Sequence, residues 1–172
     1  MFSEARLCAG ELEENLSRLD SMLASVLAAS FSNNGGRIRE LADPLTEDEF
    51  WKKPFGYGNS FGHLVLHLTG NLNYYIGAQM AETGYIRDRP REFSESNPPS
   101  KEIALQGLDD AVAMVKSTVG EQTAEGWSKE YSAERTNCRT RLEMVLQCAA
   151  HMQHHIGQMI YLVSEWKKPP RA

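Results

Sequence analysis

The sequence has little of what marks the specialised protein classes. It contains only three cysteines, an odd number without a CxxC motif, which favours reduced thiols over a disulfide framework. Its longest apolar run, around residues 23–29, is far shorter than the roughly 20 residues that cross a bilayer. The first residues lack the basic and apolar segments of a secretory signal. These absences predict a cytoplasmic protein with no membrane partner.

The chain also lacks an excess of basic residues. It carries 18 lysines and arginines against 23 aspartates and glutamates, which gives a formal net charge of -5. A protein that binds nucleic acid needs a basic surface, so we expect no nucleic-acid partner. The remaining composition, with 41% hydrophobic residues, is that of an ordinary globular protein. We expect residues 1–172 to form a single domain with an ample core.

Strand patterns are scarce, and helical patterns occupy most of the chain. In the first, apolar residues recur mostly at steps of three and four, which predicts a helix with an apolar stripe: Leu12, Leu16, Leu19, Leu23, Val26 and Leu27. The Asn33-Asn34-Gly35-Gly36 run is expected to break or bend that helix, after which Ile38 and Leu41 could resume the stripe as far as Pro44. Long helices are predicted at about residues 4–30, 61–82, 101–119 and 140–166, and suitable capping residues precede the later elements: Thr46, Ser60, Ser100 and Thr140.

Two polar stretches separate these helices. Residues 84–100 and 121–137 are longer than ordinary turns, and neither half of the chain looks able to close a core alone. We interpret the stretch at 84–100 as a crossover connection rather than a linker between domains. Four long helices with two lengthy connections predict an all-α fold, a four-helix bundle with long crossover connections.

The five histidines fall into two clusters, one with His63 and His67 and the other with His151, His154 and His155. Each cluster holds an i,i+4 pair, which places two imidazoles on one face of a helix, one turn apart. Both pairs border an apolar stripe, so they could meet at one side of the bundle and hold one metal ion. Three imidazoles would leave coordination positions open, as catalytic metal sites do.

Plainer interpretations stand beside this one. A helical histidine is often a hydrogen-bonded boundary residue, and His63 is ambiguous because it shares a face with His67. His154 points about 100° away from His155, which predicts a surface residue or a donor behind the ligands. Cys148 lies one turn before the second pair and could be a fourth ligand, a redox-active thiol or a buried structural residue.

The arginines near residue 89 form a further candidate group. Arg87, Arg89 and Arg91 could hold an anionic substrate, or they could belong to a solvated, salt-bridged loop.

Two motifs together resemble the DinB-like superfamily. Residues 59–72 resemble a branch whose second helix reads NS-x-x-x-L-x-L-H-L-x-G-N, and the second motif is His151-x3-His155-Ile156-Gly157-Gln158. Residues 88–93 loosely resemble the R-x-R-x-x-E-F loop of the same branch. The resemblance covers nearly the whole chain. One departure is Ile156, which stands where family members typically have a basic residue.

The resemblance implies a DinB-like four-helix bundle with a divalent metal bound by His67, His151 and His155, and it leaves His63 as an extra. Zinc is the first choice for the metal, with nickel, manganese or iron as alternatives. Characterised relatives include thiol-cofactor S-transferases and a mycothiol-dependent isomerase, in which the metal is thought to activate the thiol. The physical logic is that a divalent cation lowers the pKa of a bound thiol or water.

The resemblance therefore implies a metal-dependent enzyme that acts on a small-molecule substrate. The activity it favours is that of an S-transferase that uses a low-molecular-weight thiol. Alternatives are a metal-assisted hydrolase, a non-enzymatic metal- or small-molecule-binding stress protein, and a structural bundle without metal. Dimeric relatives also imply a homodimer, with Tyr85, Trp127 and Trp166 at element ends as candidate contacts.

Overall fold

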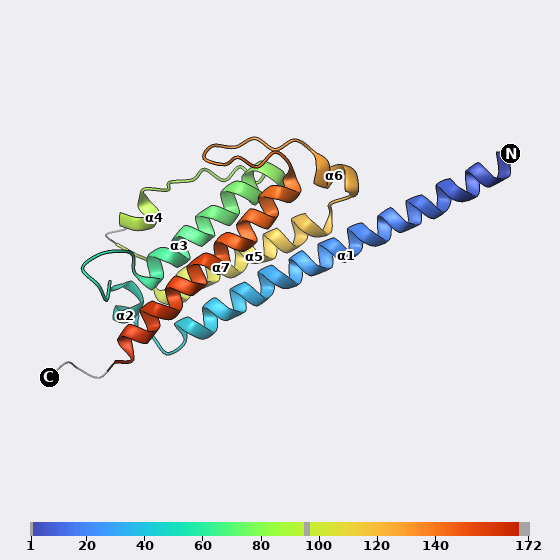
Figure 1. The fold of residues 1–172 in the computed structure, drawn as a ribbon. Coiled ribbons are helices and arrows are strands. Elements are labelled where there is room, and N and C mark those ends of the chain that lie inside the picture. The colour runs from blue at the N-terminus through green and yellow to red at the C-terminus, as the bar shows by residue number, and fades with distance from the viewer. Residues whose placement is uncertain (1, 95–96, 169–172) are drawn as a thin grey trace.

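The computed structural model describes residues 2–94 and 97–168, with side chains described from residue 10 onward. Four long helices run side by side (Figure 1). They are α1 (Phe2–Ala42), α3 (Phe61–Leu72) with its π-helical extension η1 (Asn73–Ala78), α5 (Lys101–Gly120) and α7 (Arg141–Trp166). Short helices α2 (Glu47–Trp51), α4 (Arg91–Ser94) and α6 (Ala124–Ser128) lie in the connections. The described residues contain no strand, only an isolated bridge between Glu130 and Thr140. The predicted all-α bundle is confirmed.

The packing of the long helices gives the order around the bundle. Helix α1 packs against α5 and α7, and α3 packs against the same two, so α1 and α3 occupy opposite corners. The side chains that fill the centre are apolar at helical spacing, as expected for the inner face of a bundle helix. The largest of them, each under 2% exposed, are Phe31, Phe50, Phe61, Ile38, Leu64, Leu68, Leu72, Ile76, Leu108, Met144, Met152 and Met159.

The predicted caps begin the helices where expected. The hydroxyls of Thr46, Ser60, Ser100 and Thr140 each accept a hydrogen bond from the backbone N–H three residues on. Each cap satisfies one of the N–H groups that a helix start leaves without an intrahelical partner. At Ser60 the third residue is His63, whose Nδ1 lies 2.8 Å from the Ser60 hydroxyl.

The expected break at Asn33-Asn34-Gly35-Gly36 is wrong, because α1 continues through it to Ala42. Tertiary contacts explain the continuity. Gly35 lies so close to α5 that a Cβ there would stand 3.4 Å from a methyl carbon of Val112. Asn34 is only 2% exposed, and its side-chain oxygen accepts a hydrogen bond from Gln153 of α7. Packing on two neighbouring helices therefore outweighs the low helix propensity of the glycines.

The apolar stripe of the first helix is exposed over half the length of α1. Leu12, Leu19 and Val26 are 55–61% exposed, and the helix becomes buried only from Leu27, at 4%. Figure 1 shows the reason, since the N-terminal half of α1 extends beyond the ends of the other long helices. The apolar spacing identified the helix correctly but could not say what covers it.

The two connections bring polar residues over the bundle. The segment from residue 84 to 100 includes α4, which packs against α3, so it crosses the bundle as predicted. The segment after α5 includes α6, and its Tyr131 hydroxyl donates a hydrogen bond of 2.8 Å to the carbonyl of Tyr75 in η1. Across the described residues, every helix is too short or too polar to cross a membrane.

Candidate metal centre

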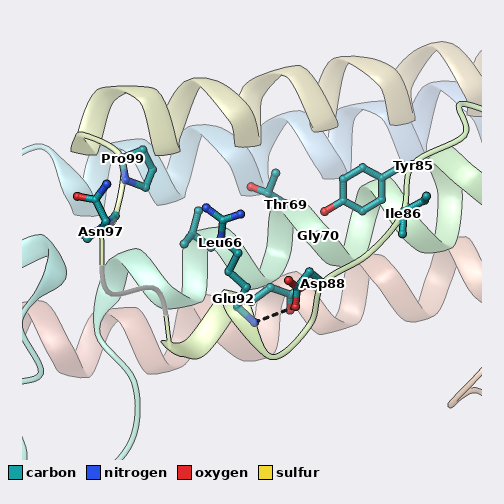
Figure 2. Close-up of a pocket in the computed structure, with 11 residues that line it drawn as sticks. Leu66, Thr69, Gly70, Tyr85, Ile86, Asp88, Glu92, Asn97 and Pro99 are labelled. Carbon is teal, nitrogen blue, oxygen red and sulfur yellow. Dashed lines mark hydrogen bonds between the residues drawn. The ribbon is translucent and has the colours of Figure 1, made fainter.

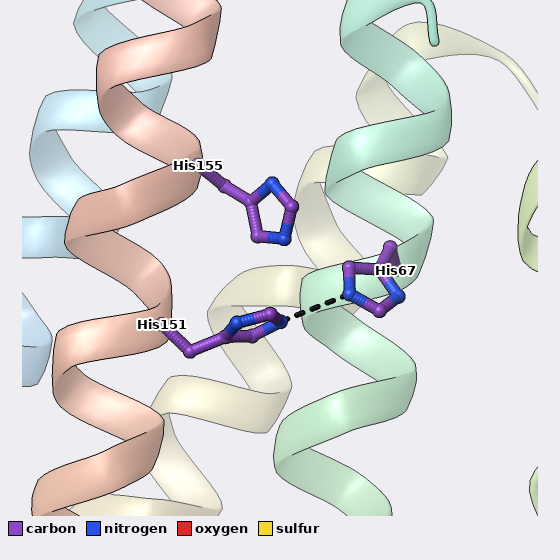
Figure 3. Close-up of side chains that lie close together, drawn as sticks. All are labelled: His67, His151 and His155. Carbon is purple, nitrogen blue, oxygen red and sulfur yellow. Dashed lines mark hydrogen bonds between the residues drawn. The ribbon is translucent and has the colours of Figure 1, made fainter. Parts of the chain in front are cut away.

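Three histidines from two helices converge inside the bundle (Figure 3). His67 projects from α3, and His151 and His155 project from successive turns of α7, which packs against α3. One ring nitrogen from each of the three lies within 4.8 Å of the others. The closest pair is His67 Nε2 and His151 Nε2, at 2.9 Å. The two histidine clusters thus meet as the sequence predicted, although 84 positions separate their nearest members.

The second nitrogen of His67 is held from the crossover connection. His67 Nδ1 lies 2.8 Å from a carboxylate oxygen of Glu92, and both residues are buried. Arg87 donates to both oxygens of the same carboxylate, at 2.7 and 2.9 Å. Burial alone would raise the pKa of Glu92, but the hydrogen bonds from His67 and Arg87 outweigh it and hold that pKa below its usual value. The ionised carboxylate accepts the Nδ1 proton, so His67 presents the lone pair of Nε2 to the centre.

Gly70 makes room for this carboxylate. A Cβ on Gly70 would lie 2.2 Å from Glu92 Oε1 and 3.0 Å from its carboxyl carbon. Real Cβ atoms do not approach so closely, so only glycine lets the carboxylate lie against the α3 backbone at this point. Gly70 is the glycine of the H-L-x-G-N pattern, and its physical role is to leave space for the Glu92 carboxylate.

His155 is oriented by its own helix. Its Nδ1 lies 2.8 Å from the side-chain oxygen of Gln158, one turn later, and the Gln158 amide nitrogen lies 3.1 Å from His154 Nε2. With the Nδ1 proton donated to that oxygen, Nε2 carries the lone pair. This Nε2 is buried without a hydrogen-bond partner among the described residues. A buried polar atom without a partner is uncommon and suits a ligand to an ion.

The charge state of the α7 pair suits metal binding. Burial, assisted by the other histidines, lowers the pKa of His151 to about 3. Burial likewise lowers the pKa of His155 to about 4, against the opposing hydrogen bond from Gln158. Both rings are therefore neutral near pH 7, which is the state in which imidazole ligates a metal.

The other candidate residues lie outside the cluster. His63 serves the start of α3 through Ser60 and packs edge-on against Trp51, with ring centres 5.9 Å apart. His154 is exposed, and Gln158 links it to His155 through hydrogen bonds to both rings. Cys148 is not one of the clustered metal-ligating groups found among the described residues; it is 1% exposed, and burial raises the pKa of its thiol. A reactive thiolate at Cys148 is therefore disfavoured.

A cavity of about 190 Å³ opens beside His67 and His151. Tyr75 and Cys148 belong to its walls, and Arg87 and Arg135 come to it from the two connections. It adjoins a groove of about 450 Å³ that has Tyr74 in its lining and shares the arginines. The cavity therefore gives access to two of the three histidines, with Tyr75 of η1 beside them in its lining.

A larger cavity of about 560 Å³ lies on the other side of Glu92, between α3 and the crossover connection (Figure 2). Gly70 and Glu92 line it, but the three histidines do not. The three arginines of the connection therefore occupy different places: Arg87 binds Glu92, Arg89 lines the small cavity and Arg91 lines the larger one.

Sequence reasoning did not assign a role to Glu92. It lies 25 positions from His67, and no helical spacing relates the two. The available signal was the loose likeness of residues 88–93 to the family loop, which contains this glutamate. Gln158 had a similar signal, as the last residue of the second motif.

Comparisons with known proteins agree with the fold. A family model, described as the DinB superfamily, matches residues 30–159. Among solved structures, the chain is similar to one described as the crystal structure of the conserved protein of locus from Enterococcus faecalis, with a TM-score of 0.68 and 19% sequence identity. That match covers 82% of this chain and 95% of the other, and at such identity it shows the fold alone. No curated protein matches.

Proposed function

Since this chain belongs to the DinB superfamily, we propose that His67, His151 and His155 hold one divalent metal ion in a metal-dependent enzyme. The observation that carries the proposal is the buried, partnerless Nε2 of His155, which faces two further ring nitrogens. Glu92 and Gln158 occupy the opposite nitrogens of two of the rings. Such outer hydrogen bonds are typical of metal-ligating histidines, because they fix the ring and its tautomer.

The ligand set supports a catalytic rather than a closed site. Three neutral imidazoles add no charge, and the charge of Glu92 is balanced by Arg87. A divalent ion held here would lower the pKa of a thiol or water and so provide a nucleophile near pH 7. The cavity beside His67 and His151 gives a small molecule access to the ligands. Zinc is our first choice, because imidazole suits it, with nickel, manganese or iron as alternatives.

Within this class, we propose transfer chemistry that uses a low-molecular-weight thiol as the leading activity. The choice rests on the family resemblance, since metal-assisted hydrolysis would use the same residues. A non-enzymatic role in binding a metal or a small molecule is the other alternative.

Metal content and turnover test the proposal together. Protein purified without an affinity tag should contain about one divalent ion per chain by elemental analysis. His151→Ala should lose the ion and keep the helical spectrum, because that ring contributes little to the core. His154→Ala is the matched control, since this neighbouring ring is exposed and should leave metal content unchanged. Full metal content and turnover in His151→Ala would refute the site.

A panel of thiols and electrophiles then separates the activities. Turnover that requires both the ion and a thiol supports the transferase. Hydrolysis without any thiol selects the hydrolase, and stoichiometric metal without turnover on the panel selects the binding role.

We also propose that the protein is a homodimer, paired through the exposed half of α1. Leu12, Leu19 and Val26 recur every seven residues and are 55–61% exposed. A seven-residue apolar repeat is the pattern by which helices pair. Trp127, by contrast, is 4% exposed within its own chain and is not available for pairing. Light scattering should give twice the chain mass of 19.3 kDa, and Leu19→Lys should reduce it to the single-chain value. A parent protein of single-chain mass at micromolar concentration would refute pairing.

A further inference from the structure

The small cavity contains a buried polar group that no protein atom satisfies. Asn71 is 7% exposed, lines the cavity, and its side-chain oxygen has no hydrogen-bond partner among the described residues. It follows His67 by four residues on α3, so the two side chains lie on one face of the helix. An unsatisfied buried amide costs about 1–3 kcal/mol, so this arrangement is unfavourable unless a ligand completes it.

Two arginines stand around the same cavity without a carboxylate partner in the described part of the chain. Arg89 and Arg135 both line it, and neither forms an ion pair with a described residue. The guanidinium of Arg89 is held over the ring of Phe93, 5.4 Å from its centre. Arg87, which also lines the cavity, is already committed to Glu92. Arg89 and Arg135 therefore have donors available for an anion.

The backbone at Arg135 supports a functional role. Its φ is 64°, in the left-handed region that costs a non-glycine residue roughly 1–2 kcal/mol. The loop is pinned there, because the hydroxyl of Tyr75 donates to the carbonyl of Glu134 at 3.1 Å and that of Tyr131 donates to the carbonyl of Tyr75. Strained residues of this kind concentrate at ligand sites. Here the strained residue is the one whose side chain reaches the cavity.

We propose that this cavity is the substrate pocket and that it takes a small molecule bearing a carboxylate. Arg89 and Arg135 bind the carboxylate, and Asn71 binds the polar group that lies next to the three histidines. The cavity volume of about 190 Å³ lies below the roughly 300–1,000 Å³ of typical ligand pockets, so it suits a small molecule or one end of a larger one. The proposal rests on the proposed function and adds the substrate class to it.

Guanidinium groups suit this ligand for a geometric reason. Their planar N–H pairs match the two oxygens of a carboxylate, and such bonds are stronger than those between neutral groups. A carboxylate at the arginines would leave the rest of a small molecule directed along the α3 face, past Asn71 and toward His67. A neutral analogue would leave both arginines without an acceptor and should bind more weakly.

The test compares mercaptoacetate with mercaptoacetamide, which share the thiol and differ in the carboxylate. Calorimetric dissociation constants are measured on metal-loaded and on metal-free protein. We expect the acid to bind at least tenfold more tightly than the amide in both forms. The ratio of the two dissociation constants measures what the arginines contribute to binding. The increase in affinity on metal loading measures the contact between the thiol and the metal. Failure of the proposed function would remove the gain and leave the ratio, so the two failures are distinguishable.

Variants then show which residues cause the tighter binding of the acid, measured as the ratio of the amide and acid dissociation constants. Arg135→Asn should lower this ratio severalfold, because only Arg89 then remains to bind the carboxylate. The melting temperature should be unchanged or higher, because asparagine tolerates the left-handed region. Arg139→Asn is the matched control, since Arg139 is 86% exposed on the same connection and should preserve the ratio. Asn71→Leu should weaken both probes severalfold and raise the melting temperature, because it removes the unsatisfied amide. Equal binding of acid and amide to the parent protein, or a full ratio in Arg135→Asn, would overturn the proposal.

Discussion

Replacing Gly70 with alanine should separate the positioning of His67, a proposed metal ligand, from the stability of the helix. The new Cβ would lie 2.2 Å from Glu92 Oε1, so the carboxylate must move. That carboxylate ends a flexible side chain, but Arg87 and His67 hold it through three hydrogen bonds. Moving the carboxylate should break its hydrogen bond to His67 Nδ1, which frees the ring to rotate away from His151 and His155.

Two opposing terms set the size of the effect. Alanine in place of glycine inside a helix gains about 1 kcal/mol. Loss of one hydrogen bond to a charged group costs about 1.5–3 kcal/mol. The Gly70→Ala variant should therefore be destabilised by roughly 0.5–2 kcal/mol, which lowers the melting temperature by about 1–8 °C for a chain of this size. Metal affinity should fall about 10–100-fold, as for other changes to the groups that orient a metal-ligating histidine.

Gly36→Ala provides the control. Gly36 lies inside α1, and a Cβ there would meet nothing within 4 Å. This variant should gain about 1 kcal/mol and keep its metal affinity. Thermal melts and competition with a chromogenic chelator measure both quantities. If Gly70→Ala were stabilised as much as Gly36→Ala and bound the ion with the parent affinity, the carboxylate of Glu92 would not position His67.

Two further predictions concern the other histidines and their neighbours. Burial and the nearby Lys53 lower the pKa of His63 in the folded state, so its contribution to stability is present above the unfolded pKa of about 6.5 and is lost as the pH falls. In denaturant titrations, His63→Gln should therefore make the free energy of unfolding depend less steeply on pH below pH 6.5. An unchanged pH dependence would contradict this. Gln158→Leu should lower metal affinity about 10–100-fold in the chelator assay, because His155 Nδ1 loses its acceptor, whereas parent affinity in that variant would mean that packing alone holds the ring.

The local parts of this structure could be predicted from the sequence. The capping residues Ser60 and Thr140 begin their helices, and the i,i+4 spacing places His151 and His155 on one face. These features depend on residues within one helical turn, where spacing determines geometry. The meeting of these two histidines with His67 could also be predicted, because both helices carry histidines at the edge of an apolar stripe.

The wrong and missing parts depend on distant contacts. Gly35 looked like a break because its closeness to Val112 on α5 cannot be read from its own neighbours. The spacing of Leu12 and Leu19 identified an apolar helical face, but spacing alone does not show whether that face is covered. Glu92 was missed since it reaches His67 from a connection without regular structure. For Gly35 and Glu92 the deciding neighbour is tens of residues away in the sequence, and for Leu12 and Leu19 the rest of the bundle does not cover the apolar face.

The geometry of α3 explains why a histidine, a glycine and an asparagine occur together in its second half. Successive residues of a helix turn by about 100°, so positions three and four residues after His67 lie about 60° to one side of it and about 40° to the other. Gly70 occupies the first side, where the missing side chain admits the Glu92 carboxylate to His67 Nδ1. Asn71 occupies the second and lines the cavity. The imidazole is therefore fixed from one side and exposed to a bound molecule from the other, and exchanging the glycine and the asparagine would remove both functions without changing the composition of the helix.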